Sequence, residues 1–476
     1  MVVLQDPPGY EQEKDRVLDR LADTVNVAQF VSFAAGKEPT QRFSRVRGWR
    51  PNHRFATAQD AIGSLLAASP EGAVNIRTFR PETPKGGPFF LRLCHAGEIL
   101  HALWGLSREG FYTIVNETVD VNDGGVSGVV LGDVLEFAPD DTPRCVDKPG
   151  TVAIERRKGL RILETVYRFR PALDFPPDRR VEFSIHPKPR GVRSEHTTIW
   201  ELEHHSAVSP TPRTDWPNHF SRLIGDKAFG LLVADVFGLA VPRTTVISRR
   251  VAPFSFGRPT GTSEVWFRTC PFEQMPGKLK TTRGWSDPFQ VVAEEDPDGN
   301  LLSSVLSQQA INAQFSGAAA SGEDGALILE GTVGTGDPFM LGERGSTDLP
   351  AEVVKAVRVL HQRASALLGP IRCEWVYDRV QSWVVQLHRG TIPSRGQVIY
   401  PGMVKRERHF EARDGLEALR QVIPEVQRSG EGMVIDGDIG VLSHMGDLLR
   451  KAKIPSRIEH SNPGPPEQAQ LAWKTG

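Results

Sequence analysis

The chain has 476 residues, of which 57 are basic and 58 acidic, so its formal net charge at pH 7 is -1. Hydrophobic residues make up 39% and charged residues 24%, an ordinary globular balance that suggests roughly two to four domains of the usual size. Proteins that bind nucleic acid usually carry a basic excess, so this composition gives no sign of a nucleic-acid partner.

The cysteines and the apolar segments indicate the compartment. The four cysteines are far apart and form no CxxC pair, which argues against a disulfide framework or a zinc site and fits a reducing cytoplasm. The first residues show no signal-peptide pattern, and no apolar run approaches the roughly 18 residues of a membrane-spanning helix. We therefore expect a cytoplasmic protein without a membrane partner, and the sequence indicates no oligomeric state.

Residues 1–205 mix helical and strand patterns and predict an α+β domain that matches no family known to us. We expect helices over 15–31 and 57–68 and strands over 111–121, 128–138 and 179–187. The Asn-Asp-Gly-Gly segment at 122–125 is typical of a hairpin turn. A proline-flanked loop follows, for which turn chemistry and an acceptor-binding pocket are both open interpretations; its charged residues are Asp140, Asp141 and Arg144.

The rest of the chain predicts further domains. Residues 206–217 contain three prolines and predict a linker. Residues 218–392 predict an α/β domain, and residues 393–460 a small domain that precedes a flexible tail at 461–476. In these two domains we expect helices over 226–238, 349–369, 415–427 and 444–453, and a hairpin of strands over 372–378 and 382–388.

Several segments of the α/β domain carry residues suited to phosphate and metal binding. Lys227 begins the predicted helix in GDKAFGLL, and Arg268 lies in the strand VWFRTCP; both cations can hold phosphate oxygens. Glu330 opens the segment EGTVGTGD, whose glycines permit a tight turn or a close backbone approach. Glu374 and Gln386 stand twelve residues apart on the two strands of the predicted hairpin, and such oxygen ligands can hold Mg²⁺. Taken singly, each has an ordinary structural alternative, such as a surface cation or a glycine turn.

Taken together, these segments resemble the nucleotide-binding domain of the pyruvate phosphate dikinase and phosphoenolpyruvate synthase group, which has an ATP-grasp fold. The resemblance implies ATP and Mg²⁺ as cofactors, with Glu374 and Gln386 as metal ligands. His388 takes the place of an arginine that the family uses in catalysis, and whether the next residue, Arg389, substitutes for that arginine stays open. The resemblance also implies a set of ATP-binding residues: Lys227, Arg268, Arg283, Gln308 or Gln309 at the adenine edge, and Glu330.

The segment GMVIDGDIGVLSHMGDLLRKAKIPSRI resembles the mobile domain of the same group, whose histidine carries a phosphoryl group. His444 follows a serine as in the family, and Arg450 and an Ile-Pro pair come after it at the family's spacing. A histidine at the start of a helix suits this role, because the backbone N–H groups and the helix dipole favour an added phosphate. Leu442 replaces a threonine and Asp447 adds a negative charge, so a capping or core histidine is the alternative.

The resemblance implies an ATP-dependent phosphotransferase, a kinase in which His444 is charged from ATP and passes the phosphate to an unidentified acceptor. The implied fold is an ATP-grasp domain followed by a small swivelling domain. The barrel that binds phosphoenolpyruvate in the dikinases is not recognisable, an organisation similar to that of the rifampin phosphotransferases. Two alternatives stay open: an ATP-grasp ligase that activates a carboxylate as an acyl phosphate, and an inactive ATP-binding sensor, which Leu442 and His388 favour.

Overall fold

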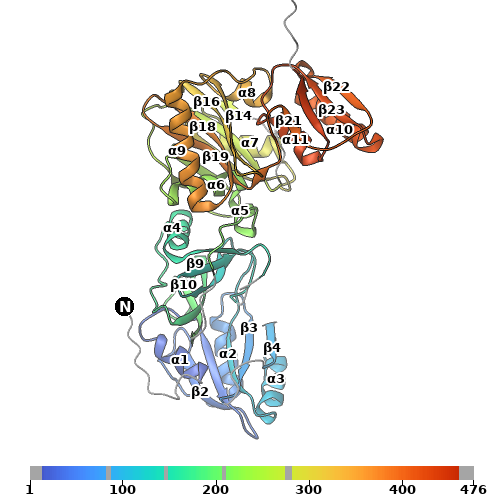
Figure 1. Cartoon of the computed structure of the whole chain (residues 1–476). Helices are drawn as coiled ribbons and strands as arrows, with labels where there is room; N and C mark the ends of the chain where they lie inside the picture. Colours follow the sequence, from blue (N-terminus) through green and yellow to red (C-terminus); the bar gives the residue numbers. More distant parts are fainter. Residues whose placement is uncertain (1–12, 82–86, 144–147, 206–210, 274–280, 460–476) are drawn as a thin grey trace, which may run out of the picture. The chain divides into compact units, whose positions relative to one another are not determined.

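The computed structural model describes residues 13–81, 87–143, 148–205, 211–273 and 281–459 (Figure 1). The architecture is mixed α/β with several, mainly antiparallel, sheets. Contacts divide the chain into two compact units, 1–224 with 248–254 and 225–247 with 255–476. Among the described helices, none combines the length and the apolar character needed to cross a membrane.

The first unit contains two five-stranded sheets, of strand order β2-β1-β5-β3-β4 and β10-β9-β6-β7-β8. Helices α2 and α3 bury Ile62, Leu65 and Leu103 against Val31 and Ile76 of the first sheet. The strands are β1 (Phe30–Ala34), β2 (Thr40–Arg45), β3 (Val74–Phe79), β4 (Phe89–Leu93), β5 (Tyr112–Glu117), β6 (Val126–Leu131), β7 (Val134–Ala138), β8 (Val152–Glu155), β9 (Arg179–Arg190) and β10 (Glu195–His204). The helices are α1 (Lys14–Leu21), α2 (Ala58–Ala68), α3 (Ala96–Arg108), α4 (Arg156–Tyr167) and α5 (His219–Ile224).

Several predictions for the first unit were wrong. The helix expected over 15–31 ends at Leu21, because the Asn26 side chain bonds to the carbonyls of Arg190 and Thr197 and β1 begins a few residues later. The strand expected over 128–138 is the hairpin β6–β7, which turns at Gly132 with a φ of 58°. Residues 122–125 form no hairpin turn, since β5 and β6 belong to different sheets.

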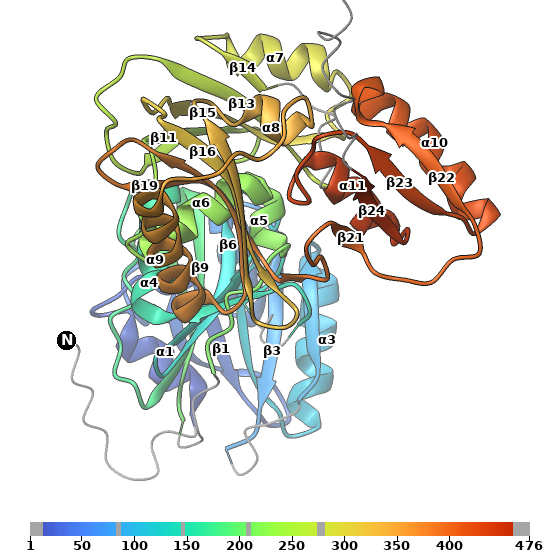
Figure 2. The same cartoon turned by 45° about the horizontal axis from the view of Figure 1, so that its top comes forward.

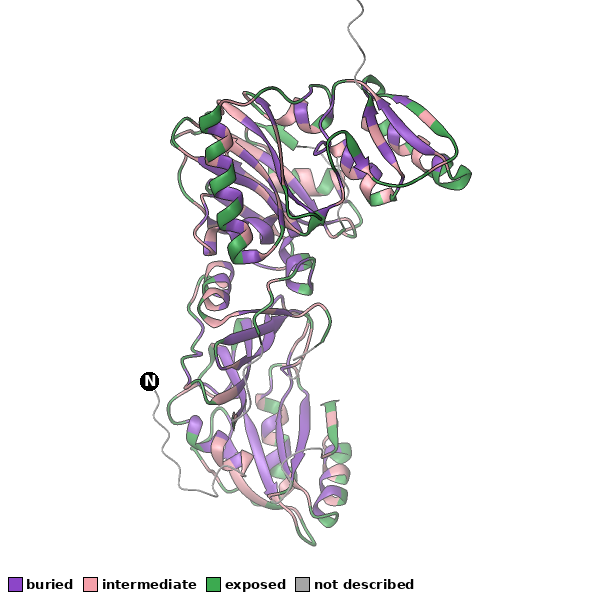
Figure 3. Ribbon diagram, viewed as in Figure 1, coloured by how far each residue is buried: buried purple, intermediate pink, exposed green. Residues whose placement is uncertain are grey.

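The second unit contains two further sheets, β12-β11-β15-β13-β14 and β17-β16-β18-β19, and the short β20 pairs with β16. Helix α6 packs on β13 and β19 and so touches both sheets, while α9 covers β16, β18 and β19 and leaves its outer side exposed (Figure 3). The strands are β11 (Thr244–Ser248), β12 (Phe254–Phe256), β13 (Val265–Pro271), β14 (Thr281–Arg283), β15 (Leu302–Gln309), β16 (Phe315–Gly322), β17 (Leu327–Val333), β18 (Ile371–Tyr377), β19 (Ser382–Arg389) and β20 (Thr391–Ile392). The helices are α6 (Asp226–Val236), α7 (Pro288–Glu295), α8 (Asp337–Leu341) and α9 (Ala351–Leu368). The helices expected over 226–238 and 349–369 and the hairpin expected from 372 to 388 are thereby confirmed.

A four-stranded sheet of order β21-β24-β23-β22 ends the described chain and belongs to the same compact unit (Figure 2). Strands β22, β23 and β24 run parallel, and β21 is antiparallel to β24. Phe410, Ile435 and Ile458 of this sheet share one core with Leu419 of α10 and Leu449 of α11, so both helices cover the same face. The elements are β21 (Val398–Tyr400), β22 (Glu407–Glu411), β23 (Gly432–Asp436), β24 (Ser456–Glu459), α10 (Gly415–Ser429) and α11 (His444–Ala452), which confirms the helices expected over 415–427 and 444–453.

Candidate functional site

A cleft that is open to solvent lies between the two larger sheets of the second unit. Strands β13 and β15 line one side of this cleft, and β16, β18 and β19 line the other. Its wall combines the side chains of Trp266 and Ile311 with the charged groups of Arg268, Asp337 and Glu374. A cleft with apolar walls and a few converging polar groups is the usual form of a small-molecule site.

The segment that joins the two sheets also faces the cleft. Strand β15 ends at Gln309 and β16 begins at Phe315, and the connecting residues Ala310 and Ile311 line the cleft. Gln308 Nε2 donates to Thr244 Oγ1 at 3.2 Å, and Gln309 Oε1 accepts from the N–H of Thr260 at 3.2 Å. Both predicted adenine-edge residues therefore lie at the cleft, with their side chains tied to neighbouring backbone and hydroxyl groups.

A bulge in β19 supplies a backbone carbonyl that binds Arg268 of β13. Glu374 of β18 lies directly opposite Gln386, whereas the next residue, Trp375, pairs with Val384, so Val385 is an extra residue. The Val385 carbonyl accepts from Arg268 Nη1 at 3.1 Å, and the same nitrogen is 3.9 Å from Glu374 Oε2. The buried Nε of Arg268 has no hydrogen-bond partner among the described residues, so a donor remains for an anionic ligand.

Gln386 is oriented by His388. Gln386 Nε2 lies 2.8 Å from His388 Nε2, and desolvation together with the charges of Arg372 and Lys227 lowers the pKa of His388 to about 3. A neutral ring accepts the amide N–H, which leaves the Gln386 carbonyl oxygen free to bind a metal ion. His388 therefore does not supply the positive charge that an arginine would have at this position.

Arg372 is a cation beside His388 that the sequence analysis did not select. Arg372 lies directly opposite His388 in the β18–β19 pair and lines a narrow cavity that Glu374 and Gln386 also line. Arg389 follows His388 and therefore points to the other face of the sheet, where its guanidinium lies beside Gly369. Because Arg372 is two residues before Glu374, strand alternation on the predicted hairpin was the signal that could have found it.

His444 begins α11 beside the same cavity, which is also lined by Leu442 and Asp447. Ser443 caps the helix by accepting from the N–H of Gly446. His444 Nδ1 is 3.7 Å from Asp447 Oδ2, and this buried nitrogen has no hydrogen-bond partner among the described residues. The cavity therefore joins the Glu374–Gln386 pair to the start of α11.

The charge of Asp447 is neutralised. Its carboxylate pairs with Arg372 at 2.9 Å and with Arg450 at 2.6 Å. Burial alone would raise the pKa of Asp447, but Arg372, His444 and Arg450 together hold it well below its ordinary value. The negative charge that Asp447 adds next to His444 is thus balanced by two guanidinium groups.

Asp337 lies near the charged residues described above. Its pKa is raised, chiefly by burial and also by Glu374, while Arg268 and His444 act in the opposite direction. Asp337 is therefore within electrostatic range of Arg268, Glu374 and His444. Two carboxylates and an amide oxygen that face arginine side chains form a set suited to a hard divalent cation and the phosphates that it accompanies.

Glu330 has a different position from the one expected of an ATP ligand. Its Oε1 accepts from the N–H of Val441 at 3.0 Å and its Oε2 from the N–H of Leu442 at 2.8 Å. Burial raises the pKa of Glu330, and a Cβ at Gly440 would lie 2.6 Å from its Oε2. Glu330 therefore joins the glycine-rich segment to the loop that leads into α11.

Comparisons with known proteins give only distant similarities. No protein-family model and no curated protein matches the chain. Among solved structures, the D-alanine–D-alanine ligase of Helicobacter pylori is 10% identical, with a TM-score of 0.25, over 35% of this chain and 51% of that one. The ligase of Coxiella burnetii is 13% identical (TM-score 0.24; 35% of this chain, 47% of that one), and that of Bacillus anthracis, complexed with ATP, is 12% identical (TM-score 0.23; 34% and 53%). The chain spans about half the length of these ligases, and similarity at such TM-scores carries no argument about its function.

The remaining predicted residues are not gathered at the cleft. Lys227 lies at the start of α6, within electrostatic range of His388. Arg283 lies on the exposed strand β14 and pairs with Glu264 at 2.7 Å. In the first unit, Asp140 pairs with Arg250 and Asp141 with Lys148, while Arg144 lies outside the described residues. The paired carboxylates give no support to an acceptor pocket in that loop.

A buried Ser-His-Asp chain in the first unit is structural. His186 Nδ1 lies 2.6 Å from Asp123 Oδ2 and its Nε2 lies 2.7 Å from Ser184 Oγ, which also accepts from Trp200 Nε1 at 2.6 Å. Ser184 is 0% and His186 1% exposed, so no substrate can reach the hydroxyl. These bonds satisfy buried polar groups rather than activate a nucleophile.

Proposed function

We propose that the chain binds Mg²⁺–ATP in the cleft of the second unit and transfers a phosphoryl group from it to His444. The observation that carries this proposal is one cavity lined by Glu374, Gln386 and Arg372 that reaches the start of α11. The two antiparallel sheets that face each other across the cleft agree with the ATP-grasp fold that the sequence resemblance implies.

Each side chain has a role that follows from its chemistry. Glu374 and Gln386 would hold Mg²⁺, with Asp337 close by, and the ion would neutralise the charge that develops on the phosphates. Arg268, whose buried Nε has no hydrogen-bond partner among the described residues, would hold the nucleotide phosphates. The apolar walls around Trp266 and Ile311 would receive the base, with Gln308 and Gln309 at its edge.

In this proposal His444 acts as the nucleophile. Asp447 stays ionised at neutral pH because its pKa is low, and it faces the Nδ1 side of the ring. A negative charge there favours the tautomer with a proton on Nδ1, which leaves the Nε2 lone pair to attack phosphorus. In the dikinase chemistry that the resemblance implies, the P–N bond forms on the β-phosphorus as the bond between this phosphorus and the oxygen that bridges to the α-phosphate breaks, and AMP leaves with the bond electrons. Water then hydrolyses the bond to the γ-phosphate, which leaves as inorganic phosphate, so that one phosphoryl group remains on His444. Arg372 would stabilise the charge on the transferring group, since His388 is neutral.

A second candidate is an ATP-grasp ligase that transfers the γ-phosphate to a carboxylate substrate. The observation that favours it is that Arg268, Glu374 and Gln386 line the cleft and the adjoining cavity, whereas His444 lines neither of them. In that case ADP rather than AMP would form, and His444 would stay unmodified.

The two candidates differ in one experiment. The full chain is incubated with Mg²⁺ and ATP labelled at either the β- or the γ-phosphate, and the label is mapped by mass spectrometry. The dikinase chemistry predicts AMP as a product and an acid-labile, alkali-stable label on His444 that is absent from His444→Ala. Formation of ADP that depends on an added carboxylate, with no label on the protein, would establish the ligase; bound ATP without any turnover would establish a sensor.

A further inference from the structure

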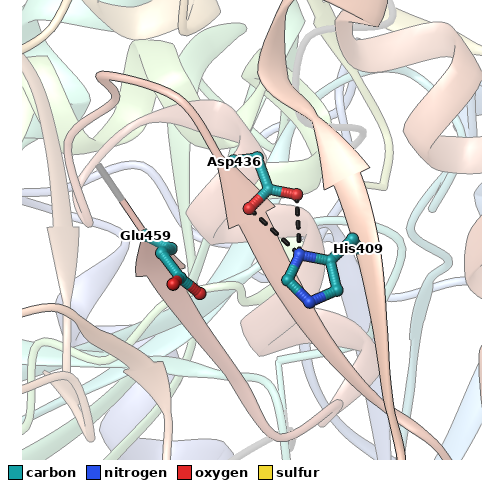
Figure 4. A group of neighbouring side chains, drawn as sticks. All are labelled: His409, Asp436 and Glu459. Carbon is teal, nitrogen blue, oxygen red and sulfur yellow. Dashed lines mark hydrogen bonds and ion pairs between the residues drawn. The ribbon is translucent and has the colours of Figure 1, made fainter. Parts of the chain in front are cut away.

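Three potential metal ligands lie together on the C-terminal sheet, outside the residues that line the cleft and the adjoining cavity. They are His409 of β22, Asp436 of β23 and Glu459 of β24 (Figure 4). One ligand atom of each lies within 4.8 Å of the others. His409 Nδ1 is 2.9 Å from one Asp436 oxygen and 3.1 Å from the other.

The strand register explains this arrangement. Asp436 pairs with Glu411 on one side and with Glu459 on the other, in parallel strands. His409 is two residues before Glu411 and therefore points to the same face. The intervening positions, such as Phe410 and Ile458, pack into the core on the opposite face. The three ligands thus stand on a packed sheet, so little conformational entropy would be lost when they close on an ion.

The neighbouring charged residues leave atoms of these three side chains available to bind a metal ion. Arg457 pairs with Glu407 at 3.0 Å and with Glu459 at 3.0 Å, so it balances part of the acidic face. Asp436 directs both oxygens at a single ring nitrogen, which leaves most of its lone pairs unused. His409 is exposed, with 60% of its side chain accessible, so an ion can approach from solvent.

We propose that His409, Asp436 and Glu459 bind one divalent transition-metal ion of the Ni²⁺ and Zn²⁺ class through the histidine Nδ1 and one oxygen of each carboxylate. The two carboxylates neutralise the charge of the ion, and an imidazole nitrogen selects these metals over Mg²⁺, which prefers oxygen ligands alone. Three protein ligands leave positions for water or for a further donor. The site is independent of the proposed nucleotide chemistry, because none of its residues contacts the cleft.

The test is calorimetric titration of the untagged full chain with NiCl₂, without nucleotide, about one pH unit above the ordinary imidazole pKa of roughly 6.5. We expect one tight ion per chain, and an affinity at least roughly tenfold weaker in His409→Ala and in Asp436→Asn. MgCl₂ should not displace the ion. Two exposed positions provide matched controls: His95→Ala, next to the exposed thiol of Cys94, and Glu417→Gln on α10, both of which should bind Ni²⁺ as the unaltered chain does.

Two results would overturn the proposal. One is equal Ni²⁺ affinity in the unaltered chain and in a folded His409→Ala variant, which would place the ion elsewhere. The other is the absence of saturable binding, which would leave His409 and Asp436 as an exposed ion pair only. Circular dichroism verifies folding, and since His409 is exposed, its replacement by alanine should leave the fold intact. ATP binding and turnover should be unchanged in every one of these variants.

Discussion

The contact between Glu330 and the loop before α11 gives the sharpest prediction. In Glu330→Gln, one side-chain oxygen can still accept from a backbone N–H of the loop. The new amide group faces the second N–H, so one buried donor loses its acceptor. Val441 and Leu442 are 2% and 4% exposed, so water does not readily replace that acceptor.

The magnitude follows from these two bonds. An unsatisfied buried donor costs about 1–3 kcal/mol, and the remaining bond loses the additional strength that the carboxylate charge gave it. We expect the loop to be held about 2–3 kcal/mol less tightly, which corresponds to roughly a 30- to 150-fold change in its opening equilibrium. Because His444 is two residues beyond Leu442, the rate of labelling of His444 by ATP should fall at least roughly tenfold.

The assay is hydrogen exchange of the amides of residues 439–443, measured by mass spectrometry, together with single-turnover labelling of His444. Glu323→Gln, an exposed carboxylate on the turn between β16 and β17, is the matched control and should change neither quantity. The affinity for Mg²⁺–ATP should stay within about twofold, since Glu330 does not line the cleft. Unchanged exchange and unchanged labelling in Glu330→Gln would refute the reasoning.

Other predictions concern single side chains. Glu374→Gln should lower Mg²⁺-dependent turnover at least about 100-fold while metal-free adenine nucleotide binds nearly as before, as fluorescence titration would show; unchanged turnover would remove this residue from the site. Asp447 has a lowered pKa, so the stability that its ionised carboxylate gives the fold is complete above roughly pH 4 and is lost as the pH falls. Asp447→Asn should lower the free energy of unfolding by about 3 kcal/mol at neutral pH and make it less dependent on pH in the acid range, as urea unfolding at a series of pH values would show. The same pH dependence in the variant and in the unaltered chain would contradict this. In the folded chain a thiol reagent should modify the exposed Cys94 but neither Cys270 nor Cys373. Burial raises the pKa of both buried thiols, that of Cys373 to about 12, so neither forms the reactive thiolate at neutral pH. Early labelling of Cys373 in peptide maps would count against the structure.

Part of the site could be predicted because strand geometry is local. The spacing of Glu374 and Gln386 and the short segment between two runs of β-forming residues indicated a hairpin, and the structure places these residues directly opposite each other. The bulge at Val385 could not be predicted, since it depends on how β19 packs, and it is this bulge that provides the carbonyl for Arg268.

The missed features depend on contacts between distant segments. Glu330 and Leu442 are more than a hundred residues apart, so no local pattern showed that the carboxylate would bond to the loop before α11. Arg372 lies beside His388 across the strand pair and not along the sequence, so only the register of the predicted hairpin indicates it. The end of α1 was missed for a similar reason, because Asn26 bonds to segments that come much later in the chain.

The most direct measurement is a crystal structure of the chain with a non-hydrolysable ATP analogue and Mn²⁺ in place of Mg²⁺, recorded with anomalous scattering from manganese. We predict an anomalous peak between the Glu374 carboxylate and the Gln386 amide oxygen, with the phosphates directed at Arg268 and the adenine beside Gln308 and Gln309. A nucleotide bound elsewhere, or a metal ion in contact with neither Glu374 nor Gln386, would contradict the account.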